Sequence, residues 1–231
     1  VLLEFIVMLF ALIAGISFST HFMAFRMRNL IAYRYDSEIR WTFGVLGASI
    51  LGLTFFLLYK GFYLDFPEAL RHAAFNTISV ATTLGFATTD YNVWPYFAPM
   101  WMLFLSSFIA GSGSTGGGIK MLRAVLLYKQ VYRELAKLVH PSATIHTKLG
   151  TQPVPAKIIY AVLAFLFIYV ASIIIMSFIL SASGLDVFTS FTAIVAMVNN
   201  TGPGLGQVGP ASTYAVLNDF QTWVCSFAML L

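Results

Sequence analysis

The sequence predicts an all-α membrane protein built from repeated units, in which a spanning helix, a short helix, a polar loop and a second spanning helix follow one another. Three observations support this prediction. Of the 231 residues, 59% are apolar and only 10% are charged, which lies outside the range of soluble globular domains. Two apolar segments are too short to cross a bilayer, and each runs into a polar loop centred on a glycine. These glycines, Gly85 and Gly202, are 117 positions apart in matching contexts.

Five segments qualify as membrane-spanning candidates, since a spanning helix needs about 20 residues. They are residues 1–18, 41–59, from 96 past 110, 158–180 and 214 to the end. The clearest is 158–180, which contains no charged residue. The chain lacks an initiator methionine, and a spanning helix that began near Tyr214 would overrun Leu231. We therefore expect a fragment that is open at both ends.

The two short apolar segments, residues 67–81 and 186–198, have the length of re-entrant helices. Asp65 and Pro67 are typical of a helix start, and Asp186 serves the second copy. The negative C-terminal end of each short helix would then point at the polar loop that follows. A cation is the expected occupant of such a place.

Basic residues predict the orientation of the chain. Eleven of the thirteen lie in two loops, which the positive-inside rule places in the cytoplasm. The eleven are Arg26, Arg28, Arg34, Arg40, Lys120, Arg123, Lys129, Arg133, Lys137, Lys148 and Lys157. Each short segment must then enter and leave the membrane from the outside, so the unit occurs twice in parallel orientation.

This topology divides the chain into three parts. Residues 1–40 would be the last helix of a preceding unit with a cytoplasmic loop. Residues 41–156 would form a complete pore unit with an interrupted final helix and a cytoplasmic loop. Residues 157–231 would form a second pore unit that is truncated at its C-terminus.

The two polar loops are predicted to form part of an ion filter. The first filter loop comprises Thr83, Leu84, Gly85 and Phe86, and the second comprises Asn200, Thr201, Gly202 and Pro203. Consecutive backbone carbonyls can replace the water around a monovalent cation, and glycine permits the backbone that aligns them. We expect Phe86 and Pro203 to wedge the loops from behind. Two copies make half a ring, so either the missing part of the chain supplies two more or two chains combine.

The third spanning segment is interrupted by glycines. The interruption, named here the glycine loop, comprises Gly111, Ser112, Gly113, Ser114, Thr115, Gly116, Gly117 and Gly118. Five glycines in eight residues are incompatible with a regular helix. The break falls about 15 residues, or roughly 22 Å of helix, below the outer end of the segment. Unwound backbone at that depth must be shielded by protein or line a conduction path, so we interpret the loop as a gate.

A nucleotide-binding hypothesis for the same glycines is rejected. Gly111, Gly113 and Gly116 spell GxGxxG, but the dinucleotide fingerprint needs a preceding strand, and here a membrane helix precedes them. A phosphate loop fails too, because Lys120 is followed by Met121 and not by Ser or Thr. We expect no nucleotide to be bound by this chain. No Ser-His-Asp or Cys-His arrangement stands out, so we do not expect an enzyme.

Lys129, Arg133 and Lys137 recur at four-residue spacing and predict a basic stripe on a helix that leaves the membrane. One hypothesis is a solvated stripe or one that faces lipid headgroups. The other is a docking surface for a cytoplasmic partner.

Three strings of this sequence resemble the superfamily of Trk, Ktr and HKT potassium transporters, and most closely its TrkH branch. The strings are T-T-L-G-F-A-T-T from residue 82, G-S-G-S-T-G-G-G-I-K from residue 111 and N-N-T-G-P-G-L-G from residue 199. Long glycine-bearing motifs in this order are specific, and the resemblance covers the whole chain.

The resemblance implies a fold of the potassium-channel type, with four pore units around one pore. This chain would hold the end of unit two, all of unit three and a truncated unit four. The transported ion would be K+, held at Thr83, Leu84, Asn200 and Thr201, with Gly85 and Gly202 as filter glycines. The loop 110–118 would obstruct the closed pore. The resemblance further implies a homodimer in the bacterial inner membrane, with a cytoplasmic ring of nucleotide-binding regulatory subunits similar to TrkA and no nucleic acid.

Potassium uptake through a filter gated by the glycine loop is therefore the leading functional hypothesis. A carrier that couples potassium to protons or sodium is the first alternative, and it should have an ionisable residue at mid-membrane. The second alternative is a membrane anchor that transports nothing and holds a cytoplasmic partner, which would leave two polar loops unexplained.

Overall fold

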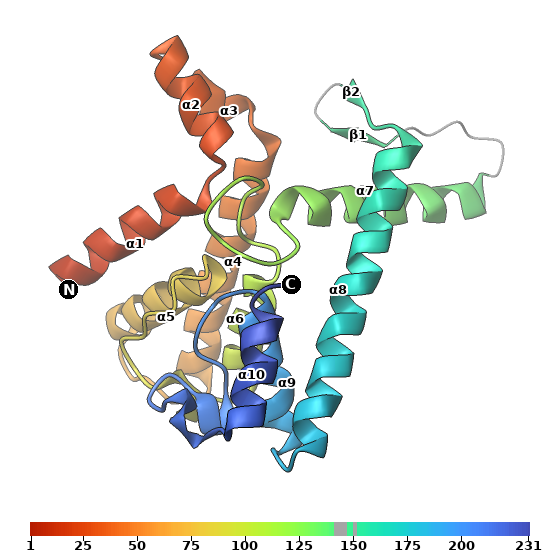
Figure 1. Cartoon of the computed structure of the whole chain (residues 1–231). Helices are drawn as coiled ribbons and strands as arrows, with labels where there is room; N and C mark the ends of the chain where they lie inside the picture. Colours follow the sequence, from red (N-terminus) through yellow and green to blue (C-terminus); the bar gives the residue numbers. More distant parts are fainter. Residues whose placement is uncertain (141–146, 150–151) are drawn as a thin grey trace.

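The computed structural model describes residues 1–140, 147–149 and 152–231. Within these residues two helices are long and apolar enough to cross a membrane, α4 (Ser37–Tyr59) and α8 (Ala156–Ala182). A third span is present if the bent pair α1 (Leu2–Gly15) and α2 (Phe18–Met27) counts as one. Figure 1 shows α4 and α8 running the length of the molecule, with the short helices α5, α6, α9 and α10 gathered beside and between them.

The remaining elements are short apart from one helix of nineteen residues, α7. They are α3 (Ile31–Tyr35), α5 (Phe66–Ala81), α6 (Phe97–Ser106), α7 (Met121–Val139), α9 (Val187–Val198), α10 (Asp219–Ala228), the 3-10 turns η1 (Tyr91–Val93), η2 (Gly206–Val208) and η3 (Tyr214–Val216), and the antiparallel strands β1 (Lys148–Leu149) and β2 (Gln152–Pro153).

The two short segments form helices with the predicted ends. α5 ends at Ala81 and α9 ends at Val198. The C-terminal half of each helix is buried. The Asp186 carboxylate accepts a hydrogen bond from the Thr189 N–H at 2.9 Å. Burial raises the pKa of Asp186, but hydrogen bonds from Thr189 and the Gln207 amide together hold it below its ordinary value. In the first copy, Asp65 occupies the N-cap position without a side-chain hydrogen bond.

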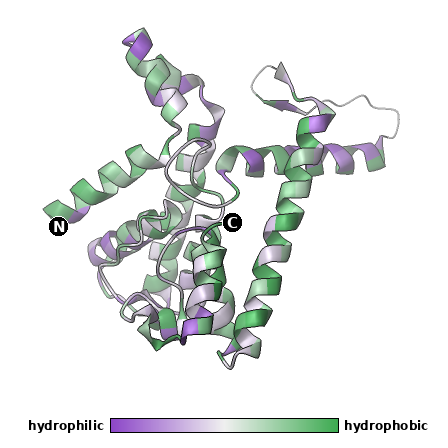
Figure 2. Ribbon diagram, in the orientation of Figure 1, coloured by the Kyte–Doolittle hydropathy of each residue, from purple (hydrophilic) through white to green (hydrophobic). Residues whose placement is uncertain are grey.

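The largest core cluster lies between helices from the first and second halves of the chain. Fully buried side chains from α4, α6, α8 and α9 form one cluster, which includes Leu53, Met102, Leu180 and Ile194. The exposed side chains of α8 are mainly large and apolar, and Figure 2 shows this helix as hydrophobic along nearly its whole length. The spans therefore present apolar faces outward, as a lipid environment requires.

The spanning candidate over residues 1–18 is not one continuous helix in the structure. α1 ends at Gly15, and the chain turns by 91° into α2. The freed backbone groups at this bend find partners in the glycine loop, because the Gly111 N–H donates to the Gly15 carbonyl at 2.9 Å and the Phe18 N–H donates to the Gly113 carbonyl at 3.2 Å. A kink at membrane depth is tolerated when neighbouring protein satisfies the backbone in this way.

The expected third span also ends early. α6 stops at Ser106, before the predicted end past Ala110. The carbonyls of Ser107 and Ala110 instead accept hydrogen bonds from Ile119 and Met121, at 2.5 and 3.0 Å, so the returning chain replaces the helical partners.

The last helix begins later than expected. Tyr214 lies in the 3-10 turn η3, and α10 starts at Asp219 behind a capping box of Asn218 and Gln221. Capping of the first backbone N–H groups by these two side chains explains why the helix begins here and not at Tyr214.

The basic stripe lies on α7, as predicted, but this helix does not continue away from the spans. Figure 1 shows α7 running across the direction of α8. The Arg123 guanidinium lies 4.2 Å from the centre of the Phe165 ring and ties the two helices together. The expectation of a helix leaving the membrane is therefore corrected to a helix lying across the end of α8.

Candidate ion filter and gate loop

Both short helices end in the same hydrogen-bonded motif. The Leu84 N–H donates to the Ser79 carbonyl at 2.8 Å, and 117 positions later the Thr201 N–H donates to the Ala196 carbonyl, also at 2.8 Å. The preceding N–H groups, those of Thr83 and Asn200, donate three residues back in each copy. This is the Schellman motif, whose C′ residue must adopt a left-handed conformation.

The C′ residues here are not glycines. Thr83 has a φ of 59° and Asn200 a φ of 54°. Gly85 and Gly202 follow two positions later with φ of 82° and 98°. In each filter loop, left-handed residues therefore alternate with a residue that is not left-handed. Such alternation turns successive carbonyls toward the same side, which a ring of ion-coordinating oxygens requires.

The two filter loops touch one another. A Cβ added to Gly85 would lie 2.6 Å from the Thr201 carbonyl oxygen and 3.6 Å from the Pro203 ring. For Gly202 the nearest atom to an added Cβ is the Gly85 Cα, at 3.9 Å. The two filter loops therefore lie side by side in the structure. Only Gly85 is confined by the backbone of the other loop.

Some backbone oxygens of the filter loops have no hydrogen-bond donor among the described residues. Within residues 1–140, 147–149 and 152–231, no hydrogen bond reaches the carbonyls of Thr83, Leu84, Asn200 or Thr201. The Gly202 carbonyl differs, because it accepts a hydrogen bond from the Tyr214 hydroxyl at 2.8 Å. The negative C-terminal ends of α5 and α9 add a favourable field for a cation.

The predicted wedge role fails for one of its two residues. The Phe86 side chain is 61% exposed in the structure and does not pack behind the first filter loop. Pro203 does contact the neighbouring loop, through its ring beside Gly85. No described residue packs over Phe86 in a way that would bury it.

Two asparagines, neither of them predicted from the sequence, brace the segments that follow the filter loops. Asn76 is fully buried, and its amide bonds the Thr88 N–H and hydroxyl, at 3.2 Å each. Asn92 donates to the Gly206 carbonyl at 3.2 Å and accepts from the Gly206 N–H at 2.9 Å. This second amide joins the segments that follow the two filter loops. The available signal was a polar residue inside a short apolar helix for Asn76, and a polar residue in a turn for Asn92.

The glycine loop packs directly below both filter loops. At Gly116, an added Cβ would lie 3.2 Å from the Thr83 hydroxyl oxygen and 3.4 Å from the Thr82 carbonyl oxygen. At Gly117 it would overlap the Asn199 carbonyl. The Lys120 side chain folds back onto the glycine loop, where its ammonium donates hydrogen bonds to the carbonyls of Ser114 and Gly116. The glycine loop therefore lies against the chain at the start of both filter loops.

A buried polar network supports the second filter loop from below. The Asn199 amide accepts from the Tyr169 hydroxyl at 2.7 Å and donates to the hydroxyls of Ser106 and Ser107 at 3.0 and 3.2 Å. These residues come from α6, α8 and the end of α9, so the network holds three elements in register.

We expect Tyr169→Phe to lower the stability of the whole protein by about 1 kcal/mol, because it leaves the side-chain amide oxygen of Asn199 without its donor. The measurement is the thermal unfolding midpoint of the full-length protein in detergent. Tyr160→Phe is the matched control, since Tyr160 lies on the same helix and is 70% exposed. Equal midpoints for the two variants would contradict the role of this network.

The basic stripe is partly engaged within the chain. Lys129 donates to the Lys148 carbonyl at 2.8 Å, and the Arg133 guanidinium pairs with Glu134 at 2.8 Å. That hydrogen bond lowers the pKa of Glu134. Large apolar side chains of the same helix are exposed, among them Tyr132 and Leu138. The helix thus offers both a basic and an apolar face.

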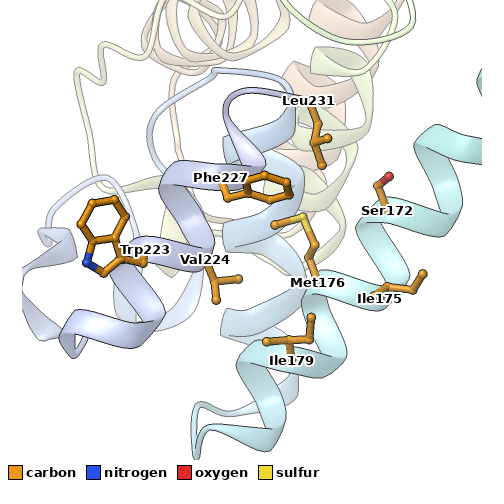
Figure 3. Close-up of a pocket in the computed structure, with 8 residues that line it drawn as sticks. All are labelled: Ser172, Ile175, Met176, Ile179, Trp223, Val224, Phe227 and Leu231. Atoms are coloured by element: carbon orange, nitrogen blue, oxygen red, sulfur yellow. The ribbon is translucent and has the colours of Figure 1, made fainter.

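A groove of about 470 Å³ lies between α8 and α10. Figure 3 shows side chains of the two helices, such as Met176 and Phe227, facing one another across it. Its lining is apolar apart from Ser172 and the Trp223 ring nitrogen, and it includes no charged side chain. A lining of this kind favours apolar contacts over the binding of a cation.

Taken together, the fold and the paired loops define a multi-pass membrane protein of repeated pore-type units. Over residues 1–231 the sequence matches the family model described as "TrkH: Cation transport protein". The chain belongs to this family, which is one of transporters and not of enzymes.

Relatives and a solved structure agree with this assignment. The chain is 39% identical over 230 residues to the Trk system potassium uptake protein TrkH of Halomonas elongata, covering 99% of this chain and 47% of that protein. It is 38% identical over 226 residues to TrkH of Escherichia coli, covering 97% and 46%. The crystal structure of the potassium transporter TrkH from Vibrio parahaemolyticus matches with a TM-score of 0.92 at 36% identity, covering 98% and 48%. The chain spans about half the length of the curated relatives that it matches.

Proposed function

We propose that this chain forms half of a potassium uptake pore. The observation that carries the proposal is the repeated pair of left-handed residues, Thr83 with Gly85 and Asn200 with Gly202, in two loops that contact each other. Free carbonyls at Thr83, Leu84, Asn200 and Thr201 are the proposed K+ ligands. Relatives that carry the name potassium uptake protein support K+ as the transported ion.

The glycine loop is the proposed gate of this pore. Its support is the contact of Gly116 and Gly117 with Thr83 and Asn199, at the inner ends of both filter loops. A loop with five glycines can leave this position by backbone rotation alone. Moving it would open the path below the filter.

The whole transporter is proposed to contain more than this chain. Two further pore units would complete the ring, in keeping with the half-length match to relatives. We propose a homodimer in the bacterial inner membrane, with a cytoplasmic TrkA-like ring of nucleotide-binding subunits. Lys129, Arg133 and Lys137 on α7 are the proposed docking residues for that ring.

A channel-like path is favoured over a carrier that couples potassium transport to protons or sodium. Residues 41–59 of α4 and 158–182 of α8 contain no Asp, Glu, Lys, Arg or His. Glu4 lies at the start of α1, where it pairs with Arg71. A proton- or sodium-coupled carrier is expected to hold an ionisable residue at mid-membrane.

The test is ion flux into liposomes that contain the purified full-length protein. We expect K+ to enter in preference to Na+, and to do so without an imposed proton or sodium gradient. Uptake that requires such a gradient would favour the coupled carrier. Absence of K+ flux under every condition would contradict the proposal and favour the membrane anchor.

A further inference from the structure

The glycine loop lacks large side chains of its own, so its position depends on partners for its backbone groups. One such partner is Glu38, at the cytoplasmic end of α4. Its side chain is buried, with 7% of the residue exposed. The Glu38 Oε1 accepts hydrogen bonds from the Ser112 N–H at 2.7 Å and from the Leu122 N–H at 3.0 Å. A single carboxylate oxygen therefore joins the second residue of the loop to the helix that follows it.

The Leu122 contact replaces a missing helix cap. Leu122 is in the first turn of α7, where backbone N–H groups have no partner inside the helix. Lys120, at the N-cap position, makes no side-chain cap hydrogen bond. Glu38 supplies the acceptor from another helix, and its negative charge lies at the positive end of α7, which is the favourable arrangement. The start of α7 and the entry to the glycine loop thus share one anchor.

Glu38 is itself held in place. Its N–H donates to the Asp36 Oδ1 at 2.8 Å, and the other Asp36 oxygen accepts from the Thr20 hydroxyl at 2.6 Å. Thr20 belongs to α2, beyond the bend that also contacts the glycine loop. A buried carboxylate is costly unless hydrogen bonds stabilise it, so its two backbone donors bind it firmly.

We propose that Glu38 is a positioning residue that holds the glycine loop in the closed position below the filter. The inference rests on the proposed gate. Displacing the loop requires the Ser112 hydrogen bond to break, or the first turn of α7 to move with it. Among the described residues, Glu38 makes no hydrogen bond to either filter loop, so it sets how often the gate opens and not which ion passes.

The test compares Glu38→Ala with Glu134→Ala in full-length protein without any regulatory subunit. Glu134 is an exposed carboxylate on α7, bonded to its neighbours Gln130 and Arg133. We expect Glu38→Ala to raise basal K+ flux on the order of tenfold, because two hydrogen bonds to a charged group are lost. The K+/Na+ flux ratio should stay unchanged. Glu134→Ala should leave basal flux unaltered.

Two conservative variants separate positioning from general stability. Glu38→Gln keeps an oxygen that can accept from both N–H groups, so basal flux should stay near that of the natural protein. Glu38→Asp keeps the charge but withdraws it by one methylene, so flux should rise; this variant tests the proposal if Glu38→Ala does not fold.

Folded Glu38→Ala or Glu38→Asp protein with unchanged basal flux would overturn the proposal. If deletion of residues 113–117 raises flux but these variants do not, the gate stands and the role of Glu38 fails; if none raises flux, the gate itself fails.

Discussion

Gly85→Ser is expected to remove most of the preference of the full-length protein for K+ over Na+. The new Cβ would lie 2.6 Å from the Thr201 carbonyl oxygen, so one filter loop must push against the other. The φ of 82° adds strain, since residues with a Cβ rarely adopt it. We expect the K+/Na+ flux ratio to fall about tenfold or more, because a distortion of ~1.4 kcal/mol already changes a ratio tenfold.

Two further glycines separate the causes of this loss. Gly202 also has a left-handed φ, 98°, but the nearest atom to an added Cβ is 3.9 Å away, so we expect a smaller loss of selectivity from Gly202→Ser. Gly184→Ser is the control, because Gly184 has a φ of 99° in open space outside the filter loops. It should leave selectivity intact. The measurement is K+ and Na+ flux into liposomes, and unchanged selectivity in Gly85→Ser would contradict the filter assignment.

Deleting residues 113–117 is expected to raise basal K+ flux by about tenfold or more, because it removes the segment that lies below both filter loops. Selectivity should persist, since the filter loops keep their own Schellman hydrogen bonds. The measurement is flux in the absence of any regulatory subunit. An unaltered closed-state leak would argue against a gate at this position.

A point variant tests the same idea with less disturbance. Gly117→Ala places a methyl group against the Asn199 carbonyl, so the glycine loop must shift away from the second filter loop. We expect basal flux to rise, though less than in the deletion. Gly47→Ala in α4 is the control, because nothing lies within 4 Å of the added carbon. Equal flux in the two variants would show that this contact does not close the pore.

Local signals in the sequence were enough to predict the repeat and its short helices. The ends of α5 and α9 fall where hydrophobic length and the 117-residue offset place them. Asp186 caps its helix as expected, because capping depends on residues close in the chain. The family resemblance is confirmed by the match over residues 1–231.

Features that depend on distant contacts were not predictable. The bend after Gly15 is stabilised by a loop about a hundred residues away in sequence. In the sequence, Glu38 is an ordinary carboxylate in the first turn of a helix. Its hydrogen bonds from the Ser112 and Leu122 N–H groups become visible only in the folded structure. In each case tertiary packing decides what local propensity leaves open.

The most direct test of the paired filter is the position of the ion. A structure of the full-length protein with Rb+ or Tl+ in place of K+ would reveal bound ions by their strong scattering. We predict ion density on the pore axis beside Gly85 and Gly202, next to the carbonyls of Thr83, Leu84, Asn200 and Thr201. Ions that bind only at other places, with these carbonyls turned away from the axis, would contradict the account.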